Sequence, residues 1–150
     1  MDITQSFRTN DIPGYIIVRL ILGYVFLVAG LQKFIFYDER GPGRFIDMGF
    51  PVPEFTAYFV GFFEVACAIL ILLGLATRLA SVPLIIIMAV AIFTTKIPQL
   101  GDGFWTFAHA VRLDFSMLMV ALFVLINGAD KWSLDHKWLS PDEPKEAISR

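Results

Sequence analysis

The sequence predicts an all-α fold, a polytopic transmembrane four-helix bundle, from two observations. Hydrophobic residues make up 57% of the 150 residues and charged residues only 17%, which is well outside the range of soluble domains. The apolar residues gather in four segments, each long enough to cross a hydrocarbon core of about 30 Å as a helix. We predict a single membrane domain over residues 1–150, with spans at about 15–37, 55–76, 79–97 and 111–127 and a polar tail at 128–150.

Composition also limits the function classes. The net charge is −2 and the sequence contains no basic run, so we expect no nucleic-acid partner. The single cysteine, Cys67, excludes an intrachain disulfide and a CxxC redox pair. The two histidines, His109 and His136, are expected on opposite faces of the membrane, and we therefore predict no metal site. The partner that composition does require is the lipid bilayer.

The first span, at about 15–37, carries Arg19 and Lys33 inside an apolar segment. At helical spacing these two charges share one stripe with two glycines. The full stripe is Arg19, Gly23, Phe26, Gly30, Lys33 and Tyr37. Glycines let another helix approach closely, whereas a lipid-facing side would reject the charges. We therefore expect the stripe to face inward, with Arg19 reaching to the cytoplasmic surface and Lys33 leaning into the bundle.

The second and third spans, at about 55–76 and 79–97, are separated only by Thr77 and Arg78. So short a connection predicts an antiparallel hairpin. The second span contains one charge, Glu64, roughly 15 Å from its start by helical rise. Most residues one turn away are small, so we expect Glu64 to face another helix and not lipid.

The two remaining connections are predicted as loops. Residues 38–53 contain repeated glycine and proline together with apolar side chains, which predicts a loop folded onto the membrane surface. Residues 99–110 are expected to form a loop with Trp105 at the membrane interface. The fourth span then begins at about residue 111, which places Asp114 about one turn inside the membrane.

These charges predict a polar pocket that opens on the loop side of the membrane. Lys33 and Glu64 lean toward each other from antiparallel helices, so we expect them to form an ion pair. Asp114 is expected at the depth of Lys33, and Lys33 would then be shared between Glu64 and Asp114. The cations expected around the mouth are Lys96, His109 and Arg112.

The residues leave a catalytic and a structural interpretation of this pocket open. In the catalytic interpretation, Glu64 and Asp114 move protons, Lys33 takes part in catalysis, and the cations bind a negatively charged substrate group. In the structural interpretation, Lys33, Glu64 and Asp114 form ion pairs that fix helix packing.

Four spans place both termini on one side of the membrane. Lysine and arginine are more frequent on that side, which predicts cytoplasmic termini. They are Arg8, Arg78, Lys131, Lys137, Lys145 and Arg150, against Arg40 and Arg44 on the opposite side.

The chain resembles the DoxX family from about residue 13 to residue 135. The resemblance lies in RLILGYVFLVAGLQKF in the first span, GFFEVACAILILLGLATRLAS across the hairpin and RLDFSMLMVALFVLINGADKWSLD at the end. It implies a small four-helix integral membrane protein in the inner or plasma membrane of a prokaryote. Relatives are associated with thiosulfate:quinone oxidoreductase, with terminal quinol oxidase complexes and with a membrane oxidoreductase assembly in thiol-stress defence.

The residues and the resemblance together leave two functions open, and with them the question of whether the chain is an enzyme. In the first, it is a quinone-linked redox subunit whose pocket takes a quinone head group or a small sulfur oxyanion. Quinone is then the cofactor, and a membrane or soluble partner subunit supplies the electrons. In the alternative, it is a non-catalytic assembly or scaffold subunit with structural ion pairs. Both functions are compatible with a homo-oligomer.

Overall fold

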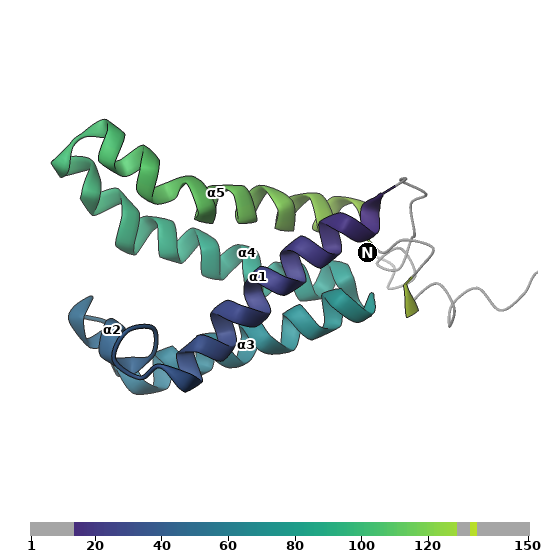
Figure 1. The fold of residues 1–150 in the computed structure, drawn as a ribbon, viewed down its shortest axis with the longest axis horizontal. Coiled ribbons are helices and arrows are strands. Elements are labelled where there is room, and N and C mark those ends of the chain that lie inside the picture. Colours follow the sequence, from purple (N-terminus) through teal and green to yellow (C-terminus); the bar gives the residue numbers. More distant parts are fainter. Residues whose placement is uncertain (1–13, 129–132, 135–150) are drawn as a thin grey trace, which may run out of the picture.

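The computed structural model describes residues 14–128 and 133–134, and these residues form helices joined by short turns (Figure 1). The elements are α1 (Tyr15–Ile35), α2 (Pro42–Asp47), α3 (Pro53–Leu73), α4 (Thr77–Ala91), the π-helix η2 (Ile92–Lys96), the 3₁₀-helix η3 (Ile97–Asp102) and α5 (Phe104–Asn127). Over this part of the chain, four segments are long and apolar enough to cross a membrane: α1, α3, α5, and the continuous segment made of α4, η2 and η3. The predicted all-α, four-span fold is confirmed.

Part of the predicted organisation lies outside the described residues. Of the predicted polar tail at 128–150, the structure describes residues 128, 133 and 134. Most of the lysines and arginines that predict the orientation also lie outside the described residues. Cytoplasmic termini and a single domain over 1–150 therefore stay predictions.

The connection between the third and fourth spans differs from the sequence prediction. A loop at 99–110 is wrong, because η3 continues to Asp102 and α5 begins at Phe104. Gly103 alone makes the turn, and its φ of 118° lies in a region that side chains rarely allow. Residues 104–110 are helical, so the fourth span is longer than predicted and Asp114 lies farther along it.

The spans pack as two pairs, α1 with α3 and α4 with α5, and the hairpin between α3 and α4 joins them (Figure 1). Glycines face each other where α1 meets α3. A Cβ atom added to Gly30 would lie 2.9 Å from the carbonyl oxygen of Gly61 and 2.7 Å from Cγ2 of Val65. Glycine is therefore what allows the two backbones to approach so closely.

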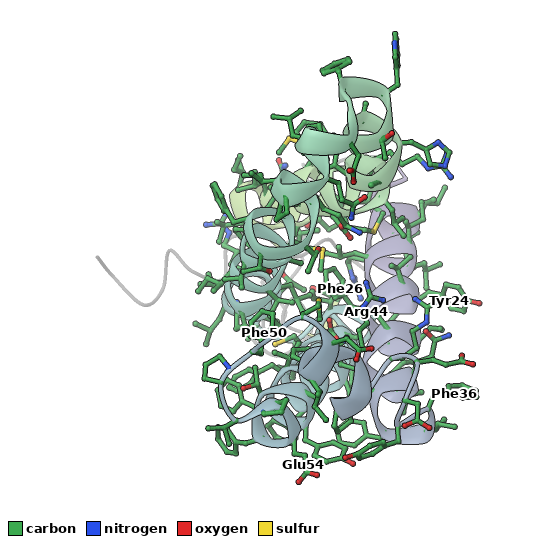
Figure 2. The ribbon with its side chains drawn as sticks, turned by 90° about the vertical axis from the view of Figure 1, so that its left-hand side faces the viewer. Tyr24, Phe26, Phe36, Arg44, Phe50 and Glu54 are labelled. Carbon is green, nitrogen blue, oxygen red and sulfur yellow. The ribbon has the colours of Figure 1, made fainter. Side chains whose placement is uncertain are left out.

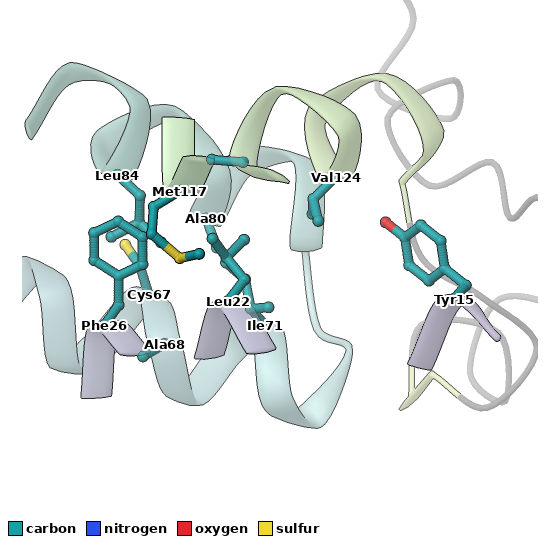
Figure 3. Close-up of a cluster of buried hydrophobic side chains, with 11 residues drawn as sticks. Tyr15, Leu22, Phe26, Cys67, Ala68, Ile71, Ala80, Leu84, Met117 and Val124 are labelled. Atoms are coloured by element: carbon teal, nitrogen blue, oxygen red, sulfur yellow. The ribbon is translucent and has the colours of Figure 1, made fainter. Parts of the chain in front are cut away.

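The inward direction of the stripe on α1 is confirmed from Arg19 to Gly30, and it is wrong for Tyr37, which lies beyond the end of α1 and is 44% exposed. Arg19, Gly23, Phe26 and Gly30 are buried, whereas Tyr24 points out of the bundle and is 67% exposed (Figure 2). The buried apolar cluster draws on all four spans (Figure 3). Its members are Tyr15, Leu22, Phe26, Cys67, Ala68, Ile71, Ala80, Leu84, Met117, Ala121 and Val124.

The segment at 38–53, predicted as a surface loop, contains the short helix α2. α2 packs against α3, and Pro42 and Phe45 are buried in this contact. The rings of Phe45 and Phe50 lie 5.3 Å apart and hold the end of α2 to the following turn. The segment is therefore held to α3 through α2, whereas Ile46 and Val52 stay exposed.

We call the opposite end of the bundle the capped end, because arginines from two spans bind the ends of the other two. Arg19 on α1 donates from Nε to the carbonyl of Ile71 at 3.0 Å and from Nη2 to that of Leu72 at 2.8 Å. These carbonyls belong to the last turn of α3, where a helix leaves carbonyls without partners and favours a cation. The expectation that Arg19 reaches the cytoplasmic surface is wrong, because it is 3% exposed.

Two further contacts close the capped end. Arg78 at the start of α4 donates to the carbonyl of Ile126 at 3.1 Å, near the end of α5. The hydroxyl of Tyr15 donates to the carbonyl of Gly128, just after α5. Each of the four spans thus has an end tied to another span at this end of the molecule.

Candidate functional site

The predicted ion pair between Lys33 and Glu64 is present. Lys33 Nζ lies 2.5 Å from Glu64 Oε2, with side chains that are 14% and 3% exposed. Lys33 Nζ also lies 3.4 Å from the carbonyl of Ala29, one turn earlier on α1. The pair sits beside the close approach of Gly30 to Gly61, so the glycines bring the two charges within reach.

Glu64 lies deep in the membrane-spanning part of α3. It follows Pro53, the first residue of α3, by eleven positions, or about 16 Å of helical rise. Glu64 is therefore near the midpoint of the 21-residue helix α3, which is long enough to cross a hydrocarbon core of about 30 Å. An unpaired charge at that depth costs several kcal/mol, which explains why the ammonium group of Lys33 contacts the carboxylate directly.

Asp114 does not share Lys33. It pairs instead with Lys96, at 3.4 Å between Nζ and Oδ2, with side chains that are 20% and 17% exposed. Because α5 begins at Phe104, Asp114 lies ten residues into the helix, or about 15 Å, and not in its first turn. The prediction of one pocket centred on Lys33 is therefore corrected to two ion pairs, one in each helix pair.

The π-helix η2 brings Lys96 to this position. Pro98 lacks an N–H, and its ring would collide with the carbonyl of Thr94 in a continuous α-helix. The preceding turn widens, and the N–H of Ile97 donates to the carbonyl of Ile92, five residues earlier. The hydroxyl of Thr95 donates to the carbonyl of Ala91 at 2.6 Å and supports the widened turn.

His109 and Arg112 lie on an exposed face of α5, one turn apart. Arg112 Nη1 is 3.3 Å from His109 Nδ1. Within the described residues, neither side chain hydrogen-bonds to or pairs with Lys33, Glu64, Lys96 or Asp114. Their expected place at the mouth of a shared pocket is therefore not what the structure shows. Also within those residues, no three histidine, cysteine or acidic side chains come close enough to hold a metal ion.

An apolar groove of about 260 Å³ lies between α3 and α4, and the sequence analysis missed it. It is lined by Phe59, Val60, Phe63, Pro83, Ile86 and Ile87. Its position on α3 is next to Glu64 in the chain, since Phe63 precedes Glu64 and Val60 lies one turn before it. The repeat of phenylalanine every four residues at Phe55, Phe59 and Phe63 was the available signal, because rings at that spacing stack along a helix.

Four spans, two ion pairs inside them and no extramembrane domain among the described residues define a class: a small polytopic membrane protein with buried charges. The DoxX family model matches residues 14–97, more than half of the chain. The chain belongs to the DoxX family.

Relatives of this chain include three proteins similar to it over most of their lengths. An uncharacterized membrane protein of Mycobacterium tuberculosis is 46% identical over 132 residues, covering 83% of this chain and 81% of that protein. CatD of Bacillus subtilis, provisionally named an oxidoreductase, is 28% identical over 81% of this chain and 84% of its own. An uncharacterized protein of Haemophilus influenzae is 28% identical, over 81% and 87% respectively. No solved structure matches the chain.

Proposed function

We propose that this protein is a quinone-linked redox subunit of a membrane oxidoreductase, in which Lys33 and Glu64 contact the quinone head group. The observation that carries the proposal is the depth of this ion pair. The side chain of Glu64 is 3% exposed and lies about 16 Å along α3, near the midpoint of that span. Charged groups at such depth are rare and mark ligand sites or proton routes in membrane proteins.

A ligand that reaches this depth has to be lipophilic and still carry a polar group for the pair. A quinone meets both requirements, because its ring is uncharged and its carbonyl oxygens accept hydrogen bonds. Lys33 donates to one of these oxygens, and Glu64 exchanges a proton with it. Reduction of quinone to quinol takes up two electrons and two protons. The electrons come from a cofactor of a partner subunit, since no side chain of this sequence carries electrons by itself.

The second ion pair fits the same proposal in a different role. Lys96 and Asp114 are less buried than Lys33 and Glu64 and place a second carboxylate inside the spans, so this pair is a second proton-carrying group on the route to the quinone. Arg112 is an exposed cation beside the exposed His109, and the two attract an anionic substrate, such as a small sulfur oxyanion, at the surface. The name of the relative CatD supports the oxidoreductase class. Cytoplasmic termini and a homo-oligomer are compatible with these roles.

One observation favours the alternative, a non-catalytic assembly or scaffold subunit. The pair of Lys33 and Glu64 is short and nearly closed off, as expected of a contact that fixes helix packing. In that case, replacing both residues with apolar side chains of similar size preserves the fold and the function together.

The test is the quinone content of purified protein. Wild type and the double variant Lys33→Met/Glu64→Met are purified in mild detergent, and extracted quinone is measured by chromatography per mole of folded protein. The proposed function predicts quinone with the wild type and its loss in the variant. The control Asp38→Asn/Arg40→Gln removes one charge of each sign from exposed positions and is expected to retain quinone. A folded double variant with wild-type quinone content would favour the scaffold function.

A further inference from the structure

We infer that the apolar groove between α3 and α4 binds the isoprenoid tail of the quinone whose head group lies at Lys33 and Glu64. This inference rests on the proposed function. The groove has a volume of about 260 Å³ and only apolar lining residues, namely Phe59, Val60, Phe63, Pro83, Ile86 and Ile87. A hydrocarbon chain is the ligand that such a lining accepts, since any polar group would lose its hydrogen bonds there.

The groove lies at the depth of the ion pair. Phe63 is the residue before Glu64, and Val60 lies one turn before it on α3. On α3, the side that faces α1 carries Glu64, and the adjoining side that faces α4 carries the groove. Val60 lies between them, so a molecule with its head at Glu64 has the groove within one helical turn.

Depth distinguishes a quinone tail from the acyl chains of ordinary lipids. Phospholipid head groups stay at the interface, about 15 Å from the middle of the membrane. A phospholipid head group at the end of the spans can therefore reach Lys33, in the last turn of α1, but not the buried Glu64 near the midpoint of α3. Only an amphiphile whose polar head is itself inside the hydrocarbon layer makes both contacts, and a quinone is such a molecule.

The lining also favours an isoprenoid over a saturated chain. The rings of Phe59 and Phe63 lie 4.9 Å apart and are tilted by 54°, so they present aromatic faces and edges to a chain in the groove. Isoprenoid chains carry rigid double bonds and lose less conformational freedom than saturated chains when they are immobilised. Pro83 gives the opposite wall a fixed ring on α4.

The test compares a quinone with an isoprenoid tail and the same quinone ring without the tail. Each is incubated with immobilised full-length protein in detergent, and bound quinone is measured by chromatography. The groove variant is Ile86→Trp, and the matched control is Val90→Trp, one turn farther on α4 and outside the groove. Both positions are exposed, at 56% and 45%, so each accepts a larger side chain. Comparing variant with wild type for each ligand cancels partition into detergent.

We expect Ile86→Trp to weaken binding of the tailed quinone by about tenfold, the effect of losing roughly two buried CH₂ groups. The tail-less ring should bind as in the wild type, and Val90→Trp should change neither ligand. Should Ile86→Trp fail to fold, Phe59→Ala removes one wall of the groove and is expected to weaken only the tailed ligand.

The other outcomes separate this inference from the proposed function. Unchanged binding of the tailed quinone in folded Ile86→Trp, or equal losses in Ile86→Trp and Val90→Trp, would overturn the tail site and leave the head-group site standing. Loss of co-purified phospholipid with unchanged quinone would show that the groove holds an acyl chain, which also overturns the inference. Failure of both ligands to bind the wild type would remove the proposed function as well.

Discussion

The capped end and the two ion pairs use charge in different ways. At the capped end, Arg19 and Arg78 donate to backbone carbonyls at the ends of α3 and α5, acceptors that cannot be protonated in the range where the protein is folded. In the ion pairs, Lys33 and Lys96 contact carboxylates, which can take up and release protons. The comparison suggests that the capped end holds the spans together and that the carboxylates are where chemistry can occur.

The ion pairs also differ from each other. The pair in the α1–α3 half is 2.5 Å long and almost fully buried, whereas the pair in the α4–α5 half is 3.4 Å long and about one fifth exposed. A buried pair is costly to break because the remaining charge is left without a partner, and the cost is smaller where the remaining side chain is less buried.

Lys33→Met is expected to give the largest effect and tests this difference. Removing the cation leaves Glu64 unpaired inside the bundle, at a cost of about 3–5 kcal/mol in the free energy of unfolding. The matched variant Lys96→Met should cost less, because the side chain of Asp114 is 20% exposed against 3% for Glu64. Unfolding in mixed micelles of mild detergent and dodecyl sulfate measures both. Equal costs for the two variants would mean that the pairs do not differ in the way their burial indicates.

Gly74→Ala tests how tightly the capped end is packed. Gly74 has a φ of 72°, and a Cβ there would lie 2.6 Å from Cβ of Ser133 and 2.7 Å from Nη2 of Arg19. Gly49 has nearly the same φ, 71°, but nothing within 4 Å. Gly74→Ala and Gly49→Ala both place a side chain on a left-handed backbone and share that cost. Gly74→Ala should therefore lower the free energy of unfolding by about 1–3 kcal/mol more than Gly49→Ala, because only its new methyl group is overpacked. The difference in unfolding free energy between the two variants isolates this term; a difference near zero would show a loosely packed cap.

Arg19→Lys has a smaller expected effect on the same end. Lysine keeps the charge but lacks the planar fork that donates to Ile71 and Leu72 from two nitrogens. The loss of one such hydrogen bond predicts a decrease of about 1–2 kcal/mol in the free energy of unfolding. Quinone content should not change, since the capped end is distant along α1 from Lys33. If Arg19→Lys kept the wild-type free energy of unfolding but lost quinone, the capped end and the ion pair of Lys33 and Glu64 would not be independent.

The smallest effect concerns Tyr37, which lies just beyond α1. Its hydroxyl donates to Glu54 Oε1 at 3.0 Å, and this hydrogen bond, followed by partial desolvation and the charge of Glu54, raises the pKa of Tyr37 above its usual value of 10.0. The neutral phenol is favoured in the folded protein. The hydrogen bond of Tyr37 therefore contributes fully to the free energy of unfolding below pH 10.0, and this contribution is lost as the pH rises through the raised pKa. Absorbance titrations of wild type and Tyr37→Phe give the Tyr37 curve by difference. Glu54→Ala should move that curve to lower pH, and an unchanged curve would contradict the contact.

The sequence predicted much of the fold and one of the two ion pairs. Helical spacing placed Arg19, Gly23, Phe26 and Gly30 on one face, and that face is buried, because burial in a membrane bundle follows the 3.6-residue period. Side chains on a helix point toward the N-terminus of that helix, and this direction on two antiparallel helices was enough to predict the ion pair between Lys33 and Glu64.

The errors have local causes that periodicity does not reveal. A segment with two glycines at Gly101 and Gly103 looks like a loop, yet only Gly103 turns the chain, so Asp114 lies deeper than predicted. The π-helix redirects Lys96 to Asp114, and nothing in the hydrophobic pattern marks it. The acceptors for Arg19 are backbone carbonyls, which every residue has, and so they leave no sequence signature.

The widened turn at Ile92–Lys96 has a consequence for comparisons within the family. A π turn holds one residue more than an α turn, so it behaves as a one-residue insertion in an otherwise regular helix. Deleting that residue would rotate everything after it by about 100° around the helix axis. In a homologue without the insertion, another side chain would face the position of Asp114, and an alignment gap at this turn should coincide with a change of the residue at that position.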